Sequence, residues 1–187
     1  MKRGGRMEIR IGGTGGQGLI LSGKMLADAL ASGGRRVAQS QTYEPTSRGG
    51  YCNSDLVVSE GEVDYPLATE LDCLVLLDRM AVKPSWALLK PGALVIADTR
   101  LCPEIPAGDH RDHHLPLSRT AIELGSERVA NMVALGALAA LAGLSDRTSL
   151  ESAVRAETPK SFLDLNLDAL AAGYRLGEQA TSPSAVG

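Results

Sequence analysis

The residues Gly13-Thr14-Gly15-Gly16-Gln17-Gly18 decide the fold, because they separate two apolar patterns of different period. Apolar side chains alternate over residues 7–11, which predicts a short strand. From Leu19 the apolar side chains follow the spacing of a helical face. We expect residues 12–18 to form no regular element, because glycines permit positive φ angles and a close backbone approach. The strand, loop and helix together predict one βαβ unit.

The same loop has the composition of an anion-binding turn. Backbone N–H groups at the start of the next helix, with the positive end of its dipole, suit a phosphate. The letters also match G-x-G-x-x-G, the dinucleotide fingerprint. That fingerprint has an acidic residue at the end of the second strand. Here the second strand is predicted over residues 36–41 and ends in amides and a hydroxyl, which disfavours a plain NAD site. A purely structural turn stays open.

Strand-like and helix-like patterns alternate along the rest of the chain. Further strands are predicted over residues 52–59, 72–77 and 93–97, and helices over 81–89, 119–124, 131–144, 148–155 and 162–176. Pro91-Gly92 is a turn signal, and residues 101–116 are expected to be a loop that can contain a short strand. The prediction is an α/β, Rossmann-like, open and mostly parallel sheet with helices on both faces and a helical C-terminal third. We expect one domain over residues 7–178, with flexible tails at 1–6 and 179–187.

Composition excludes several classes of partner. The 187 residues carry a net charge of −3, which gives no electrostatic reason to expect nucleic acid or an anionic membrane. No apolar run reaches the roughly 20 residues of a membrane span. The basic start lacks the apolar core of a signal peptide, so the cytoplasm is the expected location.

Cysteines and histidines do not form a metal-binding pattern. Cys52, Cys73 and Cys102 are far apart and none belongs to a C-x-x-C pair. Cys73 lies in an apolar run and is expected to be buried, and a structural role is favoured for Cys52. The histidines fall in residues 110–114, which we interpret as a solvated surface loop rather than a metal site. Neither a metal site nor a catalytic residue is therefore predicted.

A second polar loop follows the predicted second strand. It reads Tyr43-Glu44-Pro45-Thr46-Ser47-Arg48-Gly49-Gly50 and is longer than a simple connection requires. Arg48 offers a planar donor group for phosphate or carboxylate, or for an ion pair with another subunit. Loops that follow different strands can lie side by side at one edge of an open sheet. The glycine loop and this second loop are therefore predicted to line one crevice.

These motifs resemble the gamma subunit of the 2-oxoacid:ferredoxin oxidoreductases, a family that includes pyruvate, 2-oxoglutarate, branched 2-oxoacid, indolepyruvate and phenylglyoxylate enzymes. The glycine loop is similar to one signature of that family, and residues 43–50 are similar to a loop of the type Tyr-Gly-Pro-Glu-x-Arg-Gly-Gly. Here Glu44 stands where the family often has glycine, and Thr46 stands where it often has glutamate. The sequence from Asn131 to Gly136 resembles an Asn-Met-x-x-Leu-Gly helix. The resemblance extends over about residues 7–177.

The resemblance implies a subunit of an enzyme that oxidatively decarboxylates a 2-oxoacid to its acyl-CoA and CO₂. In that reading thiamine diphosphate, Mg²⁺ and iron–sulfur clusters belong to partner chains, and coenzyme A is a substrate. The partners are thiamine-binding alpha and beta type subunits, a ferredoxin-like iron–sulfur subunit, and ferredoxin or another acceptor. This chain alone would bind no cofactor and would be inactive, while shaping the substrate or coenzyme A entrance. The candidate binding residues are Gly13, Gly15, Gly16, Gln17, Gly18, Tyr43, Arg48, Gly49 and Gly50.

Two other classes remain open from sequence. An NAD(P)-dependent dehydrogenase would share the glycine loop, but the Gln39-Ser40-Gln41 ending of the second strand disfavours it. A nucleotide- or coenzyme A-sensing module without catalysis would also share the loop. For Asn131, a helix cap or a buried side-chain bond to the nearby loop is preferred over a catalytic role. Tyr43 is expected to anchor an interface.

Overall fold

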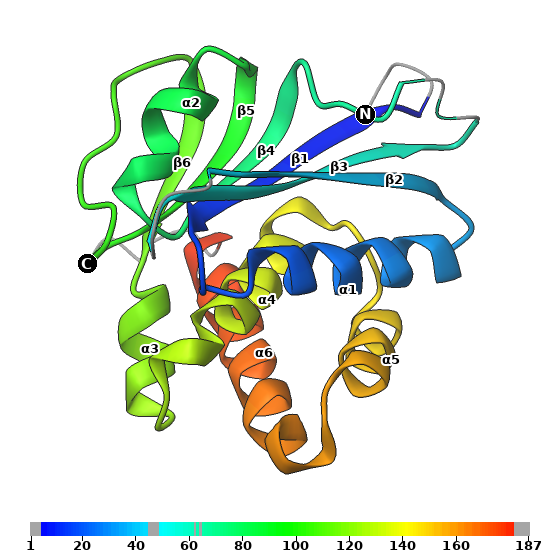
Figure 1. The fold of residues 1–187 in the computed structure, drawn as a ribbon, viewed down its shortest axis with the longest axis vertical. Coiled ribbons are helices and arrows are strands. Elements are labelled where there is room, and N and C mark those ends of the chain that lie inside the picture. The colour runs from blue at the N-terminus through cyan, green and yellow to red at the C-terminus, as the bar shows by residue number, and fades with distance from the viewer. Residues whose placement is uncertain (1–4, 45–48, 62, 64, 182–187) are drawn as a thin grey trace.

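A six-stranded sheet forms the centre of the protein, in the order β2-β3-β1-β4-β5-β6 (Figure 1). The computed structural model describes residues 5–44, 49–61, 63 and 65–181. The strands are β1 (Met7–Thr14), β2 (Arg36–Tyr43), β3 (Tyr51–Ser59), β4 (Leu71–Leu76), β5 (Leu89–Asp98) and β6 (His110–Leu115). The α/β class predicted from sequence is confirmed.

The sheet is mixed but mostly parallel. Strands β1, β4, β5 and β6 pair in parallel. Strand β3 lies between β1 and β2 and is antiparallel to both. Consequently β2 runs in the same direction as β1 but is not its neighbour, so the βαβ unit predicted from the glycine loop has a third strand inserted into it.

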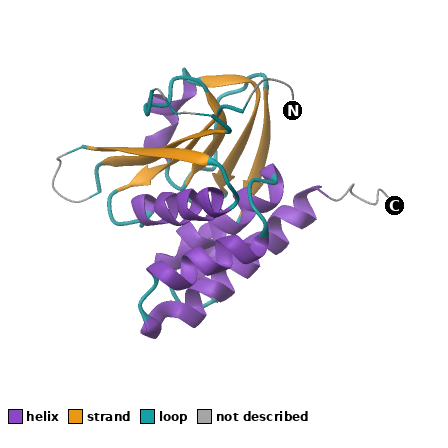
Figure 2. Cartoon of the chain, turned by 90° about the vertical axis from the view of Figure 1, so that its right-hand side faces the viewer, coloured by secondary structure: helices purple, strands orange, loops and turns teal. Residues whose placement is uncertain are grey.

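Helices cover both faces of the sheet, as predicted, but unequally. The helices are α1 (Leu19–Ser32), α2 (Val82–Trp86), α3 (Leu117–Glu123), α4 (Ala130–Ala142), α5 (Arg147–Glu157) and α6 (Lys160–Thr181), with the 3₁₀ helices η1 (Arg79–Ala81) and η2 (Glu127–Val129). Figure 1 shows α1, α4, α5 and α6 below the sheet and α2 above it, and Figure 2 shows the helical layer from the side. From Leu117 onward every described element is a helix, which confirms the helical C-terminal third.

Several boundaries differ from the sequence prediction for identifiable reasons. The helix predicted over residues 81–89 is wrong in extent, because α2 ends at Trp86 and β5 begins at Leu89. Pro91-Gly92 does not form a turn between elements; it lies inside β5, where the register against β4 shifts and Gly92 has φ 74°. Such an irregularity lets proline and glycine occur within a strand. The histidines lie in the edge strand β6, so residues 101–116 contain the short strand that the sequence allowed, and the interpretation of residues 110–114 as a loop is wrong.

The ends of the chain only partly fall within the described residues. Helix α6 continues to Thr181, past the predicted domain end at 178, and Arg6 forms an ion pair with Glu8. The rest of the two predicted tails, residues 1–4 and 182–187, lies outside the described residues. No helix in the described part of the chain is both long enough and apolar enough to cross a membrane.

Helices α4 and α6 cross with their backbones in contact. A Cβ on Gly136 would meet the backbone of α6, and a Cβ on Gly173 would meet the carbonyl of Val133 in α4. Most residues of α4 are buried, as its sequence of small and apolar residues predicts. The start of α4 lies beside the end of the glycine loop, since Asn131 contacts Gly18.

A buried ion pair lies on the face of the sheet that α2 covers. Arg10 of β1 donates from Nε and Nη2 to the two oxygens of Asp55 in β3, at 2.7 and 2.6 Å. Arg10 also donates to the carbonyl of Pro84 in α2, and Asn53 donates to Asp55. Burial alone would lower the pKa of Arg10, but the hydrogen bonds and charge of Asp55 raise it above the usual value. Arg10 therefore stays charged, and its bond to Pro84 fixes α2 against the sheet.

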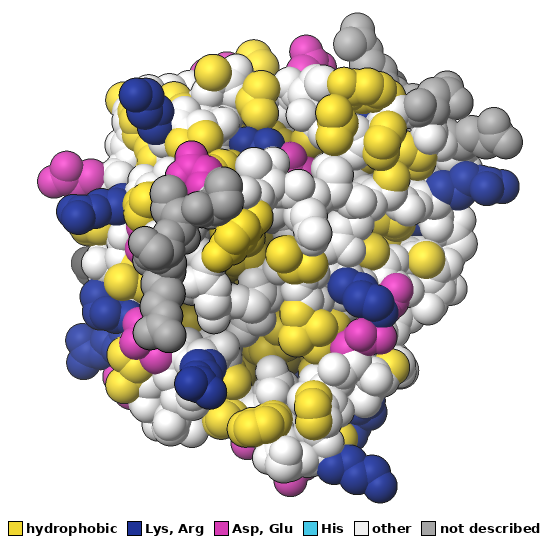
Figure 3. Space-filling view, in the orientation of Figure 1, with side chains coloured by type: hydrophobic (Ala, Val, Ile, Leu, Met, Phe, Trp, Pro, Cys, Tyr) yellow, Lys and Arg dark blue, Asp and Glu magenta, His cyan; other side chains and the backbone are white. Residues whose placement is uncertain are grey.

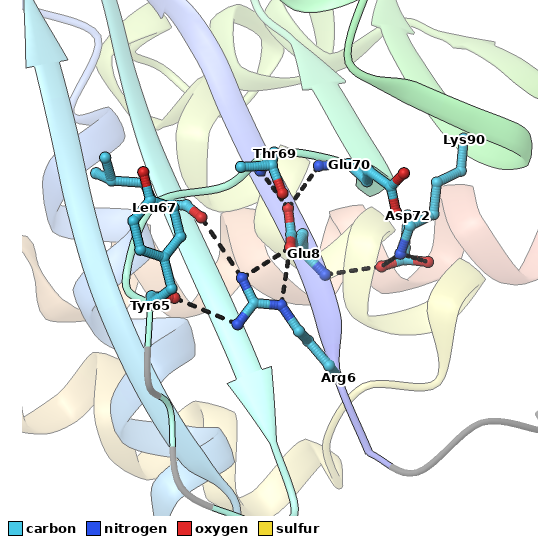
Figure 4. A network of polar contacts seen from close by, with 8 residues as sticks. All are labelled: Arg6, Glu8, Tyr65, Leu67, Thr69, Glu70, Asp72 and Lys90. Atoms are coloured by element: carbon cyan, nitrogen blue, oxygen red, sulfur yellow. Dashed lines mark hydrogen bonds and ion pairs between the residues drawn. The ribbon is translucent and has the colours of Figure 1, made fainter.

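A second charged residue of β1 fastens the segment before β4 (Figure 4). The carboxylate of Glu8 is 3% exposed and accepts hydrogen bonds from the backbone N–H groups of Thr69 and Glu70, and from Arg6. Arg6 also donates to the carbonyls of Tyr65 and Leu67. Burial alone would raise the pKa of Glu8, but the hydrogen bonds from Glu70, Thr69 and Arg6 lower it below the usual value.

This network predicts a pH-dependent contribution to stability. We expect Glu8→Gln to lower the free energy of unfolding by about 1–3 kcal/mol at pH 7, since charge-assisted hydrogen bonds are lost. The lowered folded-state pKa means that the contribution is present above the unfolded pKa of 4.5 and is lost as the pH falls through the folded value. Urea unfolding of both proteins between pH 7 and pH 3 measures this difference. A difference in unfolding free energy between the two proteins that stays constant from pH 7 to pH 3 would contradict the lowered pKa of Glu8.

Candidate functional site

The glycine loop is shorter than its sequence suggests. Strand β1 continues to Thr14, because Gly13 pairs with Cys52 and Thr14 pairs with Tyr51 in β3. The prediction that no regular element survives between residues 12 and 18 is therefore wrong for its first three residues. The irregular part is residues 15–18, which lead directly into α1 with Gly18 at φ 72° as its N-terminal cap residue.

Both polar atoms of the Gln17 side-chain amide form hydrogen bonds with backbone groups. Its Oε1 accepts from the N–H of Thr14 at 2.7 Å, and its Nε2 donates to the carbonyl of Leu77 at 3.0 Å. A Cβ on Gly13 would collide with the Gln17 amide, so the glycine makes room for this contact. Gln17 thus connects the end of β1 to the chain leaving β4. The cofactor-binding role predicted for Gln17 remains a prediction, and the structure assigns its amide to this connection.

The glycine loop and the loop between β2 and β3 lie against each other. The N–H of Gly15 donates to the carbonyl of Gly50 at 2.9 Å. A Cβ on Gly15 would be 3.0 Å from a ring carbon of Tyr43, so the tyrosine ring packs directly on the glycine backbone. The two loops predicted to line one crevice are therefore adjacent. Because β2 extends to Tyr43 and β3 begins at Tyr51, the second loop is a hairpin connection shorter than expected.

Asn131 reaches the loop from α4. Its Nδ2 donates to the carbonyl of Gly18 at 3.1 Å, and the side chain is buried. A Cβ on Gly18 would be 2.5 Å from this nitrogen. The predicted bond from Asn131 to the loop is confirmed, and it explains why a residue remote in sequence belongs to the same motif. The glycine loop is consequently fixed from β3, β4 and α4 together.

Two glycines at this end keep an open backbone. Gly16 has φ 95° and Gly49 has φ 91°, and a Cβ on either would meet no described atom within 4 Å. Their backbones are thus accessible to a partner or ligand. Arg48 lies outside the described residues, together with residues 45–47, so its predicted role rests on sequence.

An apolar rim surrounds this end of the sheet. We use this name for Ile20, Leu21, Tyr43 and Met80, which are 38, 41, 55 and 45% exposed. Ile20 and Leu21 belong to the first turn of α1, and Met80 belongs to η1, which packs on β1 through Ala81 and Gly12. Exposed large apolar side chains gathered at one edge are typical of a surface that another protein covers. Sequence reasoning missed Ile20, Leu21 and Met80, because nothing in their local patterns separates them from core positions.

Acidic residues at the ends of β4 and β5 serve the local backbone. Asp98 is fully buried and accepts from the N–H and hydroxyl of Ser118 and from the N–H groups of Arg100 and Leu101. Asp78 accepts from the N–H of Met80 and caps η1. These carboxylates position the segments after β4 and β5 and are occupied by these bonds.

The strand order bears on the dinucleotide alternative. In that site the second strand lies beside the first and carries the acidic group for the ribose. Here β3 separates β1 from β2. The amide of Gln39 in β2 instead donates to the carbonyl of Ile20 and to the hydroxyl of Ser54. The architecture therefore agrees with the sequence argument against a plain NAD site.

The cysteines are buried thiols. Burial raises the pKa of Cys52, of Cys73 to about 12 and of Cys102 to about 11, so the reactive thiolate form is scarce. The burial expected for Cys73 is confirmed, and the buried side chain of Cys52 in the main core agrees with a structural role. The ring of His110 packs edge-on against Trp86 at 5.1 Å. Among the described residues, no cluster of His, Cys, Asp and Glu has the arrangement of a metal site.

A separate cavity lies at the opposite end of β1. It has a volume of about 310 Å³ and is lined by residues including Arg6, Leu30, Arg35 and Glu60. Arg6 is already bonded to Glu8 and to the carbonyl of Tyr65, and Arg35 is 3.6 Å from Glu60. The charges in this cavity are therefore matched within the chain, and the glycine-loop end remains the candidate site.

Comparisons with known proteins agree on one family. A family model described as pyruvate ferredoxin/flavodoxin oxidoreductase matches residues 8–176. The chain is 35% identical to the 2-oxoglutarate synthase subunit KorC of Archaeoglobus fulgidus, covering 96% of this chain and 92% of the relative. It superposes with a TM-score of 0.86 and 38% identity on the gamma subunit of a keto/oxoacid ferredoxin oxidoreductase from Geobacter sulfurreducens, covering 94% of this chain and 98% of that one.

A third similarity is to part of a longer chain. The structure of 2-oxoglutarate:ferredoxin oxidoreductase from Magnetococcus marinus, with 2-oxoglutarate, coenzyme A and succinyl-CoA bound, matches with a TM-score of 0.85 and 27% identity. The match covers 96% of this chain and 32% of that chain. The same unit thus occurs both as a chain of its own and as one segment of a larger polypeptide.

The contacts of Gln17 predict a structural effect that needs no ligand. We expect Gln17→Ala to lower the free energy of unfolding by about 1–3 kcal/mol, because two backbone groups lose their partner. We expect Gln17→Glu to destabilise as well, since the carboxylate keeps the acceptor for Thr14 but cannot donate to the Leu77 carbonyl. Urea unfolding of the purified chain measures both, with the exposed Gln179→Ala as control. Wild-type stability in both Gln17 variants would show that the connection contributes nothing.

Proposed function

The chain belongs to the pyruvate ferredoxin/flavodoxin oxidoreductase family as the gamma subunit of a 2-oxoacid:ferredoxin oxidoreductase, and from this premise we propose its role in the enzyme. The proposed role is to pack on the thiamine-binding subunits and to form part of the entrance for substrate and coenzyme A. The observation that carries the proposal is the hydrogen bond between Gly15 and Gly50, which joins the two signature loops into one surface.

The shape of that surface supports packing against another chain. The glycine loop is fixed from several elements, so its form does not depend on a ligand. The apolar rim around it supplies contact area, and Gly16 and Gly49 leave room for close backbone approach. A backbone that is already fixed loses little conformational freedom on binding, which favours a stable subunit interface.

Coenzyme A is the ligand that we propose for the accessible backbone of these loops. Its phosphates match the donor groups that a glycine-rich turn and the first turn of a helix present. The Magnetococcus marinus relative was solved with coenzyme A and succinyl-CoA bound, which supports testing this ligand first. In this proposal Gly16, Gly18 and Gly49 provide backbone contacts, and Gly15 and Gly50 join the two loops. Gly13 and Gln17 hold the glycine loop, Tyr43 packs at the edge, and Arg48 meets a phosphate.

The catalytic cofactors belong to the partner chains in this proposal. Thiamine diphosphate with Mg²⁺, in alpha and beta type subunits, supplies the chemistry that releases CO₂ from the 2-oxoacid. Iron–sulfur clusters in a ferredoxin-like subunit carry the electrons to ferredoxin or another acceptor. The contribution of this chain is to position coenzyme A and to exclude water from the entrance. The buried free cysteines suit a reducing compartment, and we place the complex in the cytoplasm.

We propose 2-oxoglutarate as the substrate of the complex. The support is the similarity to 2-oxoglutarate synthase subunits along nearly the whole chain. The acid is tested by anaerobic purification of the tagged chain with its partners, followed by viologen reduction with several 2-oxoacids and coenzyme A. Activity on pyruvate, a branched 2-oxoacid or indolepyruvate in place of 2-oxoglutarate would show that the proposed substrate is wrong. The assignment of the complex as a 2-oxoacid oxidoreductase would still hold. Recovery of the chain without partners or activity would favour a nucleotide- or coenzyme A-sensing module.

The apolar rim predicts which substitutions disrupt assembly. We expect Met80→Asp to reduce recovery of the thiamine-binding subunits by at least about tenfold, because a buried unpaired carboxylate is costly. Phe162→Asp is the matched control, since Phe162 is 57% exposed at the start of α6, at the far end of the helical layer (Figure 1). Anaerobic affinity purification with quantitative mass spectrometry measures both. Equal recovery with both variants would remove the rim from the interface.

The second signature loop predicts a defect in the use of coenzyme A. We expect Arg48→Ala in the assembled enzyme to raise the KM for coenzyme A about tenfold or more, because a charge-assisted hydrogen bond to phosphate is lost. The KM for the 2-oxoacid should stay close to the wild-type value. Arg119→Ala, which removes an exposed arginine on α3, is the control. A complex that assembles normally and has an unchanged KM for coenzyme A would refute this role of Arg48.

A further inference from the structure

Strand β2 is an open edge of the sheet that lacks the usual protection. Between Arg36 and Glu44 it contains no charged side chain, reading Val-Ala-Gln-Ser-Gln-Thr-Tyr. The opposite edge, β6, reads His-Arg-Asp-His-His-Leu and is protected by charge. Figure 3 shows mostly uncharged side chains in the middle of the face where β2 and the start of α1 lie in Figure 1. A long uncharged edge of this kind pairs readily with another strand.

The backbone pattern of β2 defines which groups face outward. Strand β2 is antiparallel to β3, with Arg36 opposite Ser59 and Tyr43 opposite Cys52. The N–H of Glu44 donates to the carbonyl of Tyr51, so the even-numbered residues direct their backbone groups toward β3. Backbone direction alternates along an antiparallel strand. The N–H and carbonyl groups of Val37, Gln39, Gln41 and Tyr43 therefore face the open edge.

One antiparallel register of β2 with a second copy of itself satisfies all of these outward groups. Centred on Ser40, it places Val37 opposite Tyr43 of the second copy and Gln39 opposite Gln41 of the second copy. These are the hydrogen-bonded positions, and repeated by symmetry they give about eight backbone hydrogen bonds. A shift by one residue would place inward-facing groups opposite outward-facing ones. Because only the odd-numbered residues face outward, this register is allowed and the two registers shifted by one residue are excluded.

The same register matches the charges at both ends of the strand. It places Arg36 opposite Glu44 of the second copy, and symmetry repeats the pair at the other end. Both side chains are exposed, and within the described residues neither has an ion-pair partner. Between them, the facing side chains on the same side of the sheet are small: Ala38 against Thr42, and Ser40 against itself. A shift by two residues would replace Glu44 opposite Arg36 with Thr42.

We propose that β2 pairs with β2 of a second copy of this chain about a twofold axis at Ser40. The two sheets then form one continuous sheet, and the interface is isologous, as in most homodimers. The two proposed surfaces share only Tyr43, whose backbone pairs in this contact while its ring belongs to the apolar rim at the end of β1. The β2 contact joins two gamma subunits, and in an assembled enzyme it joins two catalytic units.

A charge-swap experiment on the full chain tests the register. We expect the wild-type chain to be dimeric in sedimentation equilibrium at tens of micromolar concentration. Arg36→Glu places like charges opposite each other at both ends and should weaken dimerisation roughly tenfold or more. Glu44→Arg should weaken it similarly, while Arg36→Glu combined with Glu44→Arg should restore it. Restoration by the double variant is a result that a general loss of stability would not give.

A proline variant tests strand pairing itself. Gln41→Pro removes an N–H that faces away from β3, a position where an edge strand tolerates proline. We expect a monomer with an unchanged circular dichroism spectrum and a melting temperature within a few degrees of wild type. A monomeric wild-type chain would overturn the proposal, as would a dimer that is indifferent to both Gln41→Pro and the charge swaps. Loss of a different subunit from the purified complex in Gln41→Pro, with a monomeric wild-type chain, would assign the edge to that subunit instead.

Discussion

The close approach of other elements to the last residues of β1 is the constraint on which the structure depends. A Cβ on Gly12 would be 2.8 Å from Ala81 of η1, and one on Gly15 would be 3.0 Å from the ring of Tyr43. Gly13 makes room for Gln17, and Gly18 makes room for Asn131. Each glycine thus admits a different part of the chain, and none of these contacts survives a larger side chain at its position. The glycines act mainly as packing positions.

The same strand carries its charged residues where both faces of the sheet are covered. Glu8 and Arg10 are 3 and 6% exposed, yet each is matched, Glu8 by backbone N–H groups and Arg10 by Asp55. A buried charge with a missing partner would cost several kcal/mol, so these residues specify which segments lie beside β1. Glu8 binds the segment before β4, and Arg10 binds β3 and α2. Strand β1 is therefore the element that defines the order of the sheet.

Sequence patterns predicted what is local and missed what depends on partners. The strand-to-helix unit, the buried α4 and the link from Asn131 to the glycine loop follow from period and residue type, and the structure confirms them. The insertion of β3 between β1 and β2 was not predictable, since a β-hairpin and a crossover connection have similar local patterns. The extension of β1 through Gly13 depends on pairing with Cys52, a residue about forty positions away. Likewise, Met80 reads as a core residue until η1 places it at the surface.

A surface made mainly of backbone groups bears on how the subunits of such an enzyme share the reaction. Gly16 and Gly49 present no side chains, and the amide of Gln17 is bonded within the chain, so the described part of this surface offers shape and backbone donors rather than reactive groups. In the proposed role, selectivity among 2-oxoacids comes from the partner chains. The same fold matches both a separate gamma subunit and about a third of a longer Magnetococcus marinus chain. The packing around β1 that defines this surface is internal to the unit, so a separate chain and a fused one can form it alike.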